Sequence, residues 1–481
     1  MHAGDVNVSS MKNDRGPNAG AGYRRQMPER GVRGTLPGKR VDNGRRRRPA
    51  IPMAAVRRGA ATRGTMMKSE LRKARSRERV ARIQALTADD PALAGRLNRI
   101  LTHARNVRVT EYHLTNACNI RCKGCWFFEY GHDTATREVK DLATLDSFLV
   151  SETKARRVNA ALVIGGEPTL FPDRLRLFVK HIRYVTVSSN GLRRLPWEGF
   201  EDVTVMLTLF GGGQLDDELR AIKPSGRQFT GLFETVLDNY RDDPRANFVY
   251  ALTEDGIGHI EETVRRIRDN GNRLSFNFYS KYGSADPTAQ EHQEALLAEA
   301  LRVKALYPDT VLSHPYYIEA MITGRTHWGA SFGYDVCPSI SIDHPDHAER
   351  LENGNPVLPF FNTWAADLKT VKFCCTSGHC DGCRDSQAVN SWLMVSMDQF
   401  LDSREMLETW IGIAEGYWNQ FVWTPFNPSA VTHAALKAER QGAQGEDGHG
   451  ADTTASGRPA LGGVMPPQTV RPTMHVPGTT H

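Results

Sequence analysis

Short runs of apolar and β-branched residues alternate with longer amphipathic stretches through the middle of the chain. The short runs predict six strands, at residues 107–115, 160–164, 184–187, 203–209, 246–252 and 274–279. Between them, apolar residues at helical spacing predict covering helices. Ile257, Ile260, Val264 and Ile267 form one such stripe, which ends near Gly271. Strands that alternate with helices are typical of a parallel sheet covered by helices, so we expect an α/β fold.

A cysteine-rich loop follows the first expected strand. Cys118, Cys122 and Cys125 stand in the run Cys-Asn-Ile-Arg-Cys-Lys-Gly-Cys. This spacing allows three thiolates to face one side of an iron–sulfur cube and leaves the fourth iron without a protein ligand. An iron with an open position can bind a small molecule, so the spacing favours a reactive cluster over an electron carrier, which normally uses four cysteines. A zinc site and a thiol redox pair are the alternatives.

Two later strands end in segments that suit a ligand. The second expected strand runs into the Gly-Gly-Glu-Pro segment 165–168, where glycines let backbone approach a ligand closely. The third runs into the Ser-Ser-Asn-Gly segment 188–191, whose short polar side chains at a strand's carboxyl end can reach hydroxyl groups. Either segment alone is ordinary turn chemistry. Their order behind the cysteine loop, after three successive strands, is what gives them weight.

The cysteine triplet and these two segments together resemble the radical S-adenosylmethionine (radical SAM) family. The resemblance implies a partial (β/α)6 barrel of the TIM type over residues 105–310, a 4Fe–4S cluster on the three cysteines, and S-adenosylmethionine (SAM) as cofactor. It assigns the SAM contacts to Gly165, Gly166, Glu167, Pro168, Ser188, Ser189 and Asn190. One departure is that Gly124 stands before the third cysteine, where most members have an aromatic residue, while Trp126 follows that cysteine.

Other residues at the expected strand ends are candidates for contacts to SAM or its substrate. They are Thr208, Phe210, Thr253, Glu254, Asn277 and Tyr279. Filling of the barrel or capping of a strand is the alternative role for each. The glycines at 211–213 predict a flexible loop after the fourth strand.

Five further cysteines lie in the C-terminal half: Cys337, Cys374, Cys375, Cys380 and Cys383. The two-residue gap between the last two is common in zinc and iron–sulfur knuckles. A looser resemblance implies a small cysteine-rich auxiliary-cluster domain of the twitch or SPASM type over residues 311–436. Four of the five thiols would hold a second 4Fe–4S cluster, and the spare thiol, at 374 or 375, would be a bystander or a hydrogen donor. Zinc, with His379 as a ligand, is the alternative.

The two ends differ in composition from the middle. Residues 1–68 hold sixteen Lys and Arg against four Asp and Glu, which predicts a disordered basic leader and explains the chain's net charge of +6. An upstream start, with initiation at Met53, Met66 or Met67, is an alternative explanation. Residues 69–104 predict a helical segment, and residues 437–481 predict a disordered tail. No nucleic-acid-binding module follows the leader, so nucleic acid is not an expected partner.

The composition is that expected of an enzyme of a reducing cytoplasm. The chain has no apolar run long enough to cross a membrane, and its eight cysteines stand in local groups typical of metal ligands. The resemblance implies reductive cleavage of SAM to a 5′-deoxyadenosyl radical that takes hydrogen from a small-molecule, natural-product or peptide substrate. Flavodoxin or ferredoxin would donate the electron. Maturase, epimerase and biosynthetic oxidoreductase or lyase reactions stay open, and a non-catalytic iron–sulfur or zinc scaffold is the alternative from another class.

Overall fold

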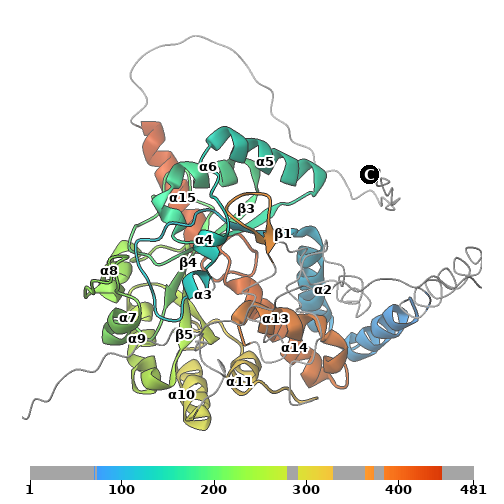
Figure 1. Ribbon diagram of the computed structural model, residues 1–481. Coiled ribbons are helices and arrows are strands. Elements are labelled where there is room, and N and C mark those ends of the chain that lie inside the picture. Colours follow the sequence, from blue (N-terminus) through green and yellow to red (C-terminus); the bar gives the residue numbers. More distant parts are fainter. Residues whose placement is uncertain are drawn as a thin grey trace, which may run out of the picture. The chain divides into compact units, whose positions relative to one another are not determined.

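The computed structural model describes residues 70, 73–129, 131–278, 291–328, 363–372 and 384–446. Its described strands form one eight-stranded sheet in the order β6-β5-β4-β3-β2-β1-β7-β8. The strands are β1 (Val109–His113), β2 (Ala160–Ile164), β3 (Tyr184–Ser189), β4 (Thr204–Leu209), β5 (Ala246–Leu252), β6 (Arg273–Phe278), β7 (Thr363–Trp364) and β8 (Val371–Lys372). In Figure 1 these strands lie at the centre, with helices around them.

The helices before and between the six long strands come first in the chain. They are α2 (Pro91–Asn106), α3 (Trp126–Glu129), α4 (His132–Ala135), α5 (Leu142–Ala155), α6 (Pro172–His181), α7 (Gly213–Leu219), α8 (Leu232–Asn239) and α9 (Ile260–Asp269). Later helices are α10 (Gln293–Leu306), α11 (Pro315–Thr323), α13 (Ser386–Val395), α14 (Arg404–Asn419) and α15 (Ala430–Glu446). Short 3-10 helices are η1 (Pro168–Leu170), η2 (Glu254–His259) and η4 (Met397–Phe400). Residues 73–87 are also helical.

The first six strands confirm the expected α/β partial barrel. Each pairs in parallel with the next along the chain, from β1 to β6. β7 adds a parallel partner on the other side of β1, and β8 pairs antiparallel with β7. The strand bounds fall within two residues of those predicted, because each apolar run is buried on the side that packs against helices.

One of the six βα units lacks its helix. The connection from β3 to β4, residues 190–203, is a sequence of turns. The fully buried guanidinium of Arg245 donates to the carbonyl oxygens of Leu195, Pro196 and Phe200 and to the carboxylate of Asp243. These bonds satisfy buried backbone oxygens that a helix would otherwise satisfy internally.

The two faces of the barrel strands carry different side chains. Outward residues pack on helices, as Tyr112 does against Phe178 with ring centroids 5.0 Å apart. Inward residues such as Ser188, Thr208 and Asn277 are small or polar and line an interior cavity. Because strand side chains alternate between faces, this pattern leaves the barrel hollow at its centre.

The glycines after β4 form a compact turn, so the predicted flexible loop at 211–213 is wrong. Gly213 begins helix α7, and the buried carboxylate of Asp216 accepts hydrogen bonds from the backbone N–H groups of Phe210 and Gly212, at 3.0 and 2.9 Å. Gly212 has φ +72°, and a Cβ there would lie 2.6 Å from Thr263 Oγ1. Glycine is therefore required here by close packing and positive φ.

The C-terminal helices pack into the same core as the barrel. Trp410 and Trp418 of α14 are buried, and Trp423 stacks on Tyr184 of β3 with ring centroids 4.6 Å apart. The helix α15 continues past residue 437, so the expected start of a disordered tail there is wrong. The boundary of an auxiliary domain at residue 311 stays a prediction. None of the described helices is both long and apolar enough to span a membrane.

Two valines on helices provide a matched test of where the core lies. Val264 of α9 is fully buried, whereas Val431 of α15 is 82% exposed. We expect Val264→Ala to lower the free energy of unfolding by about 2 kcal/mol because it removes two buried methyl groups. Val431→Ala should change it by less than about 0.5 kcal/mol. Equilibrium denaturant unfolding measures both, and equal effects would contradict the assignment of α9 to the core.

A buried histidine predicts how stability depends on pH. His103 packs against Trp418 and Phe426, and burial lowers the pKa of its imidazole to about 4. Below about pH 6.5, His103 is protonated in the unfolded chain but stays neutral in the folded protein. The unfolded state therefore binds more protons, and this histidine lowers stability as the pH falls. In His103→Phe, the loss of unfolding free energy between about pH 7 and pH 5 should be smaller by about 1 kcal/mol. Denaturant titrations at both pH values measure this difference, and equal losses in the two proteins would refute the assignment.

Candidate functional site

A cavity of about 340 Å³ opens at the carboxyl ends of the barrel strands. Side chains from β1 through β6 line it, together with the loop after β1 and residues at the ends of α13 and α14. This is the position at which parallel barrels place their binding and catalytic groups.

The three cysteines of the loop after β1 all line this cavity. The loop runs from β1 to α3, and the N–H groups of Phe128 and Glu129 donate to the carbonyl oxygen of Cys125, which starts the helix. Burial raises the pKa of the Cys118 thiol to about 12 and that of Cys125 to about 11. Metal-free thiols here are therefore neutral near neutral pH, and binding a metal cluster releases their protons.

All three thiols line one cavity, as a cluster held by three cysteines requires. Among the described residues, no three His, Cys, Asp or Glu side chains converge on one ion position. A 4Fe–4S cube takes one thiolate per iron and so requires three separated thiols around one face.

Close backbone packing joins the cysteine loop to the end of β2. The N–H of Gly166 donates to Thr115 O and the N–H of Glu167 donates to Ala117 O, both at 2.8 Å. A Cβ at Gly166 would lie 2.0 Å from Ala117 O, and one at Gly165 would lie 2.6 Å from Thr115 O. The two glycines are thus required by the cysteine loop itself, a second reason for them besides the predicted approach of a ligand.

The Glu167 carboxylate ties this junction to the end of β3. It accepts hydrogen bonds from Thr169 N–H and O–H at 3.0 and 2.6 Å, from Ser189 Oγ at 2.9 Å and from Asn190 N at 2.7 Å. Burial raises the pKa of Glu167, while these donors favour its charged form. All four of these hydrogen bonds come from backbone N–H and hydroxyl groups of the protein itself.

Asn190 links this assembly back to the cysteines. Its Nδ2 donates to Asn119 Oδ1 at 2.7 Å and lies 3.9 Å from Cys118 Sγ. The structure therefore brings the ends of β1, β2 and β3 together around one cavity, as the order of the motifs predicted.

The predicted site residues separate into three groups. Those that line the cavity are Cys118, Cys122, Cys125, Gly165, Gly166, Glu167, Ser188, Ser189, Asn190, Thr208, Phe210 and Asn277. Pro168 is buried at the start of η1, and Thr253 and Glu254 lie outside the cavity lining. Tyr279, Cys337, Cys374, Cys375, His379, Cys380 and Cys383 lie outside the described residues.

The departure at Gly124 has a local structural cause. Gly124 has φ +70°, a backbone conformation that an aromatic side chain would strain. Aromatic lining comes instead from Trp126, Phe127 and Phe128, which directly follow the third cysteine and all face the cavity.

A buried ion pair beside Cys122 was not foreseen from the sequence. Arg220 Nη1 lies 3.0 Å from Asp216 Oδ1 and also donates to Thr208 O, and the guanidinium lines the cavity. Burial raises the pKa of the Cys122 thiol, and the neighbouring Arg220 opposes that rise by favouring the thiolate. A fixed positive charge thus faces one predicted cluster ligand.

Similar proteins are found among solved structures. No family model and no curated protein matches the chain. A structure of anSMEcpe with bound AdoMet and Cp18Cys peptide is 14% identical, with a TM-score of 0.35, over 46% of this chain and 67% of that one. SuiB of Streptococcus suis, bound to precursor peptide SuiA, is 14% identical (TM-score 0.36) over 58% of this chain and 65% of SuiB.

The FeFe-hydrogenase maturase HydG from Carboxydothermus hydrogenoformans is 13% identical, with a TM-score of 0.33, over 79% of this chain and 98% of HydG. All three are radical SAM enzymes, the family that the sequence motifs resemble. Identities and TM-scores of this size carry no inference about the reaction.

Glycine 166 provides the most direct test of the cavity's construction. In the metal-free protein, we expect Gly166→Ala to displace the cysteine loop and raise the rate of iodoacetamide alkylation at Cys118 and Cys122 by about tenfold or more. Gly95→Ala in α2 is the matched control, because a Cβ there has open space. Mass spectrometry of the labelled peptides measures the rates. Alkylation of Gly166→Ala at the wild-type rate would show that the glycine does not hold the loop.

Proposed function

We propose that this protein is a radical SAM enzyme, with a 4Fe–4S cluster held by Cys118, Cys122 and Cys125. One observation carries the proposal. The cysteine loop, the Gly-Gly-Glu segment at 165–167 and the Ser-Ser-Asn segment at 188–190 all line the same cavity at the carboxyl edge of a parallel sheet.

The residues present fit both groups. Three thiols that line one cavity suit three irons of a cube, and the polar side chains at the ends of β2 and β3 suit the amino acid and ribose parts of SAM. By resemblance, Gly165, Gly166, Glu167 and Pro168 would hold the methionine amino group, and Ser188, Ser189 and Asn190 would bind ribose hydroxyls. Because Glu167 already accepts four hydrogen bonds, its main part is to fix the backbone that meets the ligand.

When bound and reduced, the cluster and SAM together supply a 5′-deoxyadenosyl radical able to remove hydrogen from an unactivated carbon. The protein positions the reactants and shields them from water. The aromatic residues Trp126, Phe127 and Phe128 form part of the cavity lining, and Arg220 offsets the negative charge of the thiolate at Cys122.

We extend the proposal to the C-terminal cysteines. Four of Cys337, Cys374, Cys375, Cys380 and Cys383 would hold an auxiliary 4Fe–4S cluster, and the spare thiol at 374 or 375 is a candidate hydrogen donor. The Cys-x-x-Cys spacing and neighbouring glycines in the sequence support this. Zinc at the same ligands is the competing assignment.

The substrate is a small molecule, a natural product or a peptide. Flavodoxin or ferredoxin in a reducing cytoplasm would supply the electron. A nucleic acid is not an expected partner.

Anaerobic reconstitution with iron and sulfide, followed by dithionite reduction with SAM, tests the proposal. We expect 5′-deoxyadenosine by chromatography and about eight irons per chain, the sum for two 4Fe–4S clusters. Cys125→Ser should lose about four irons and abolish 5′-deoxyadenosine. Ser151→Ala, an exposed position on α5, is the control and should behave as wild type.

The alternatives give different results. About four irons with 5′-deoxyadenosine would assign the C-terminal cysteines to zinc. No 5′-deoxyadenosine from fully loaded, reduced protein, with or without a peptide library, would contradict the enzyme proposal and favour a scaffold.

A further inference from the structure

The cavity has a polar inner end that the cofactor proposal does not use. Glu111 lies two residues before the end of β1, further from the cysteine loop, and pairs with Leu162 of β2. Its side chain lines the cavity. Around this level the lining also includes Asp385 and Gln387 at the start of α13 and Gln420 at the end of α14. None of these residues belongs to the motifs assigned to the cluster or to SAM.

Glu111 is a buried carboxylate that lines the cavity. It is 7% exposed, and no described residue donates a hydrogen bond to it. The nearest basic atom, His113 Nε2, lies 3.7 Å from its Oε1, beyond hydrogen-bond distance, and that nitrogen is itself buried without a partner. A buried carboxylate that accepts no hydrogen bond bears a desolvation cost, so a group that enters the cavity and donates to Glu111 would recover part of that cost.

The start of α13 does not compensate this charge. Its N–H groups are already occupied, because Ser386 N donates to Asn277 Oδ1 and Gln387 N donates to Asp385 Oδ1, both at 3.0 Å. The helix N-terminus therefore has no such donors left for an anion. Burial raises the pKa of the Asp385 carboxyl, and the nearby charge of Glu111 adds to that rise. The two acidic groups thus line one cavity, and the Arg220 guanidinium that also lines it is already paired with Asp216.

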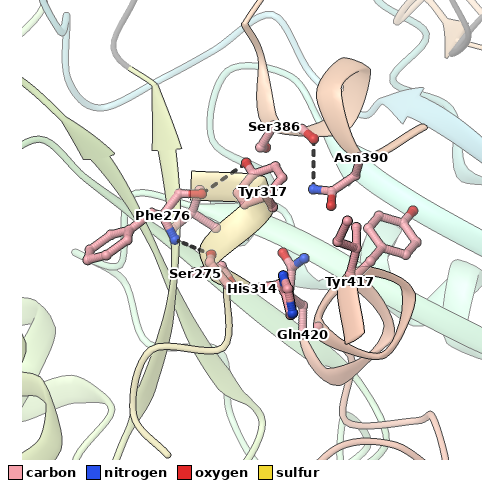
Figure 2. A pocket seen from close by; sticks show the side chains of 12 residues that line it. Ser275, Phe276, His314, Tyr317, Ser386, Asn390, Tyr417 and Gln420 are labelled. Atoms are coloured by element: carbon pink, nitrogen blue, oxygen red, sulfur yellow. Dashed lines mark hydrogen bonds between the residues drawn. The ribbon is translucent and has the colours of Figure 1, made fainter. Parts of the chain in front are cut away.

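A wall of closely packed residues that hydrogen-bond to one another lies beside this inner end. Figure 2 shows side chains of this wall, which line a second, small void. That void has a volume of about 10 Å³, room for no more than one water. Within it, Asn390 Nδ2 donates to Ser386 O at 2.8 Å and Tyr317 O–H donates to Phe276 O at 3.1 Å. The side-chain amides of Gln387 and Gln420 make no hydrogen bond to a described residue and face the large cavity. Both amides are available to a ligand in the large cavity, and Gln420 also borders the small void of Figure 2.

We infer that the inner end of this cavity binds a cationic nitrogen group of the substrate, an ammonium or guanidinium, with Glu111 as its counter-charge and the amides of Gln387 and Gln420 as further hydrogen-bond partners. This inference rests on the proposed function, because the substrate concerned is the one that the radical would attack. A substrate anchored here by its cation would extend along the barrel axis towards the cysteines, since both ends line one cavity.

The test uses three probes of matched size with the reconstituted protein and SAM. Ligand-observed NMR compares n-butylammonium, n-butanol and n-butyrate. We expect n-butylammonium to bind at least about tenfold more tightly than either other probe, as for a charge-assisted hydrogen bond. Glu111→Gln should remove about that factor for n-butylammonium alone. Glu198→Gln, which removes an exposed carboxylate, is the matched control and should bind as wild type.

The outcomes separate this inference from the proposed function. Equal binding of n-butyrate and n-butylammonium by the wild type, or full n-butylammonium binding by Glu111→Gln, would overturn the subsite. The wild-type comparison needs no variant, so misfolding of Glu111→Gln, checked by thermal unfolding, does not remove the test. Formation of 5′-deoxyadenosine by the same samples reports on the radical SAM proposal independently of probe binding.

Discussion

The contact between the cysteine loop and the end of β2 is the constraint on which the site depends. Backbone of Thr115 and Ala117 lies so close to Gly165 and Gly166 that no side chain fits between them. Two hydrogen bonds of 2.8 Å fix the register of this contact. Through it, the position of the cysteines follows from the position of a barrel strand, which is the most rigid kind of support that the fold offers.

The contact continues into the third strand through a buried carboxylate. Glu167 follows Gly166 directly and accepts hydrogen bonds from residues 189 and 190, so hydrogen bonds link the ends of β2 and β3. Asn190 then reaches back to Asn119 in the cysteine loop. Because the donors and acceptors of these residues hydrogen-bond to one another, the protein alone holds the rim of the cavity in place before any cofactor binds.

The hollow interior is the second requirement. A barrel usually fills its centre with layers of branched side chains. Here Ser188, Thr208, Ala251 and Asn277 stand at inward positions, and their small volume or polarity leaves space. The same alternation buries larger groups such as Phe248 and Tyr250 on the outer face. The outer face of these strands therefore contributes packing that stabilises the fold, and their inner face leaves space for binding.

Local patterns in the sequence were sufficient for part of this account. The strands and the cysteine, glycine and serine segments were predicted because apolar runs and turn residues act over a few neighbours. The turn at 211–213 was misjudged because Asp216, which fixes it, contributes through a side chain that no local pattern singles out. Arg220 beside Cys122, and Asp385 near Glu111, come together only through the tertiary fold. The sequence around Glu111 likewise gives no signal that its carboxylate lines the cavity.

Pulsed EPR of the reduced protein tests the central claim most directly, using SAM labelled isotopically at its methionine amino nitrogen. If the cavity holds both the cluster and SAM, the cluster signal will change when SAM is added and will show hyperfine coupling to the labelled nitrogen. That coupling should persist when the five C-terminal cysteines are replaced. A reduced cluster that shows neither change nor coupling with saturating SAM would contradict the claim that these motifs form one cofactor site.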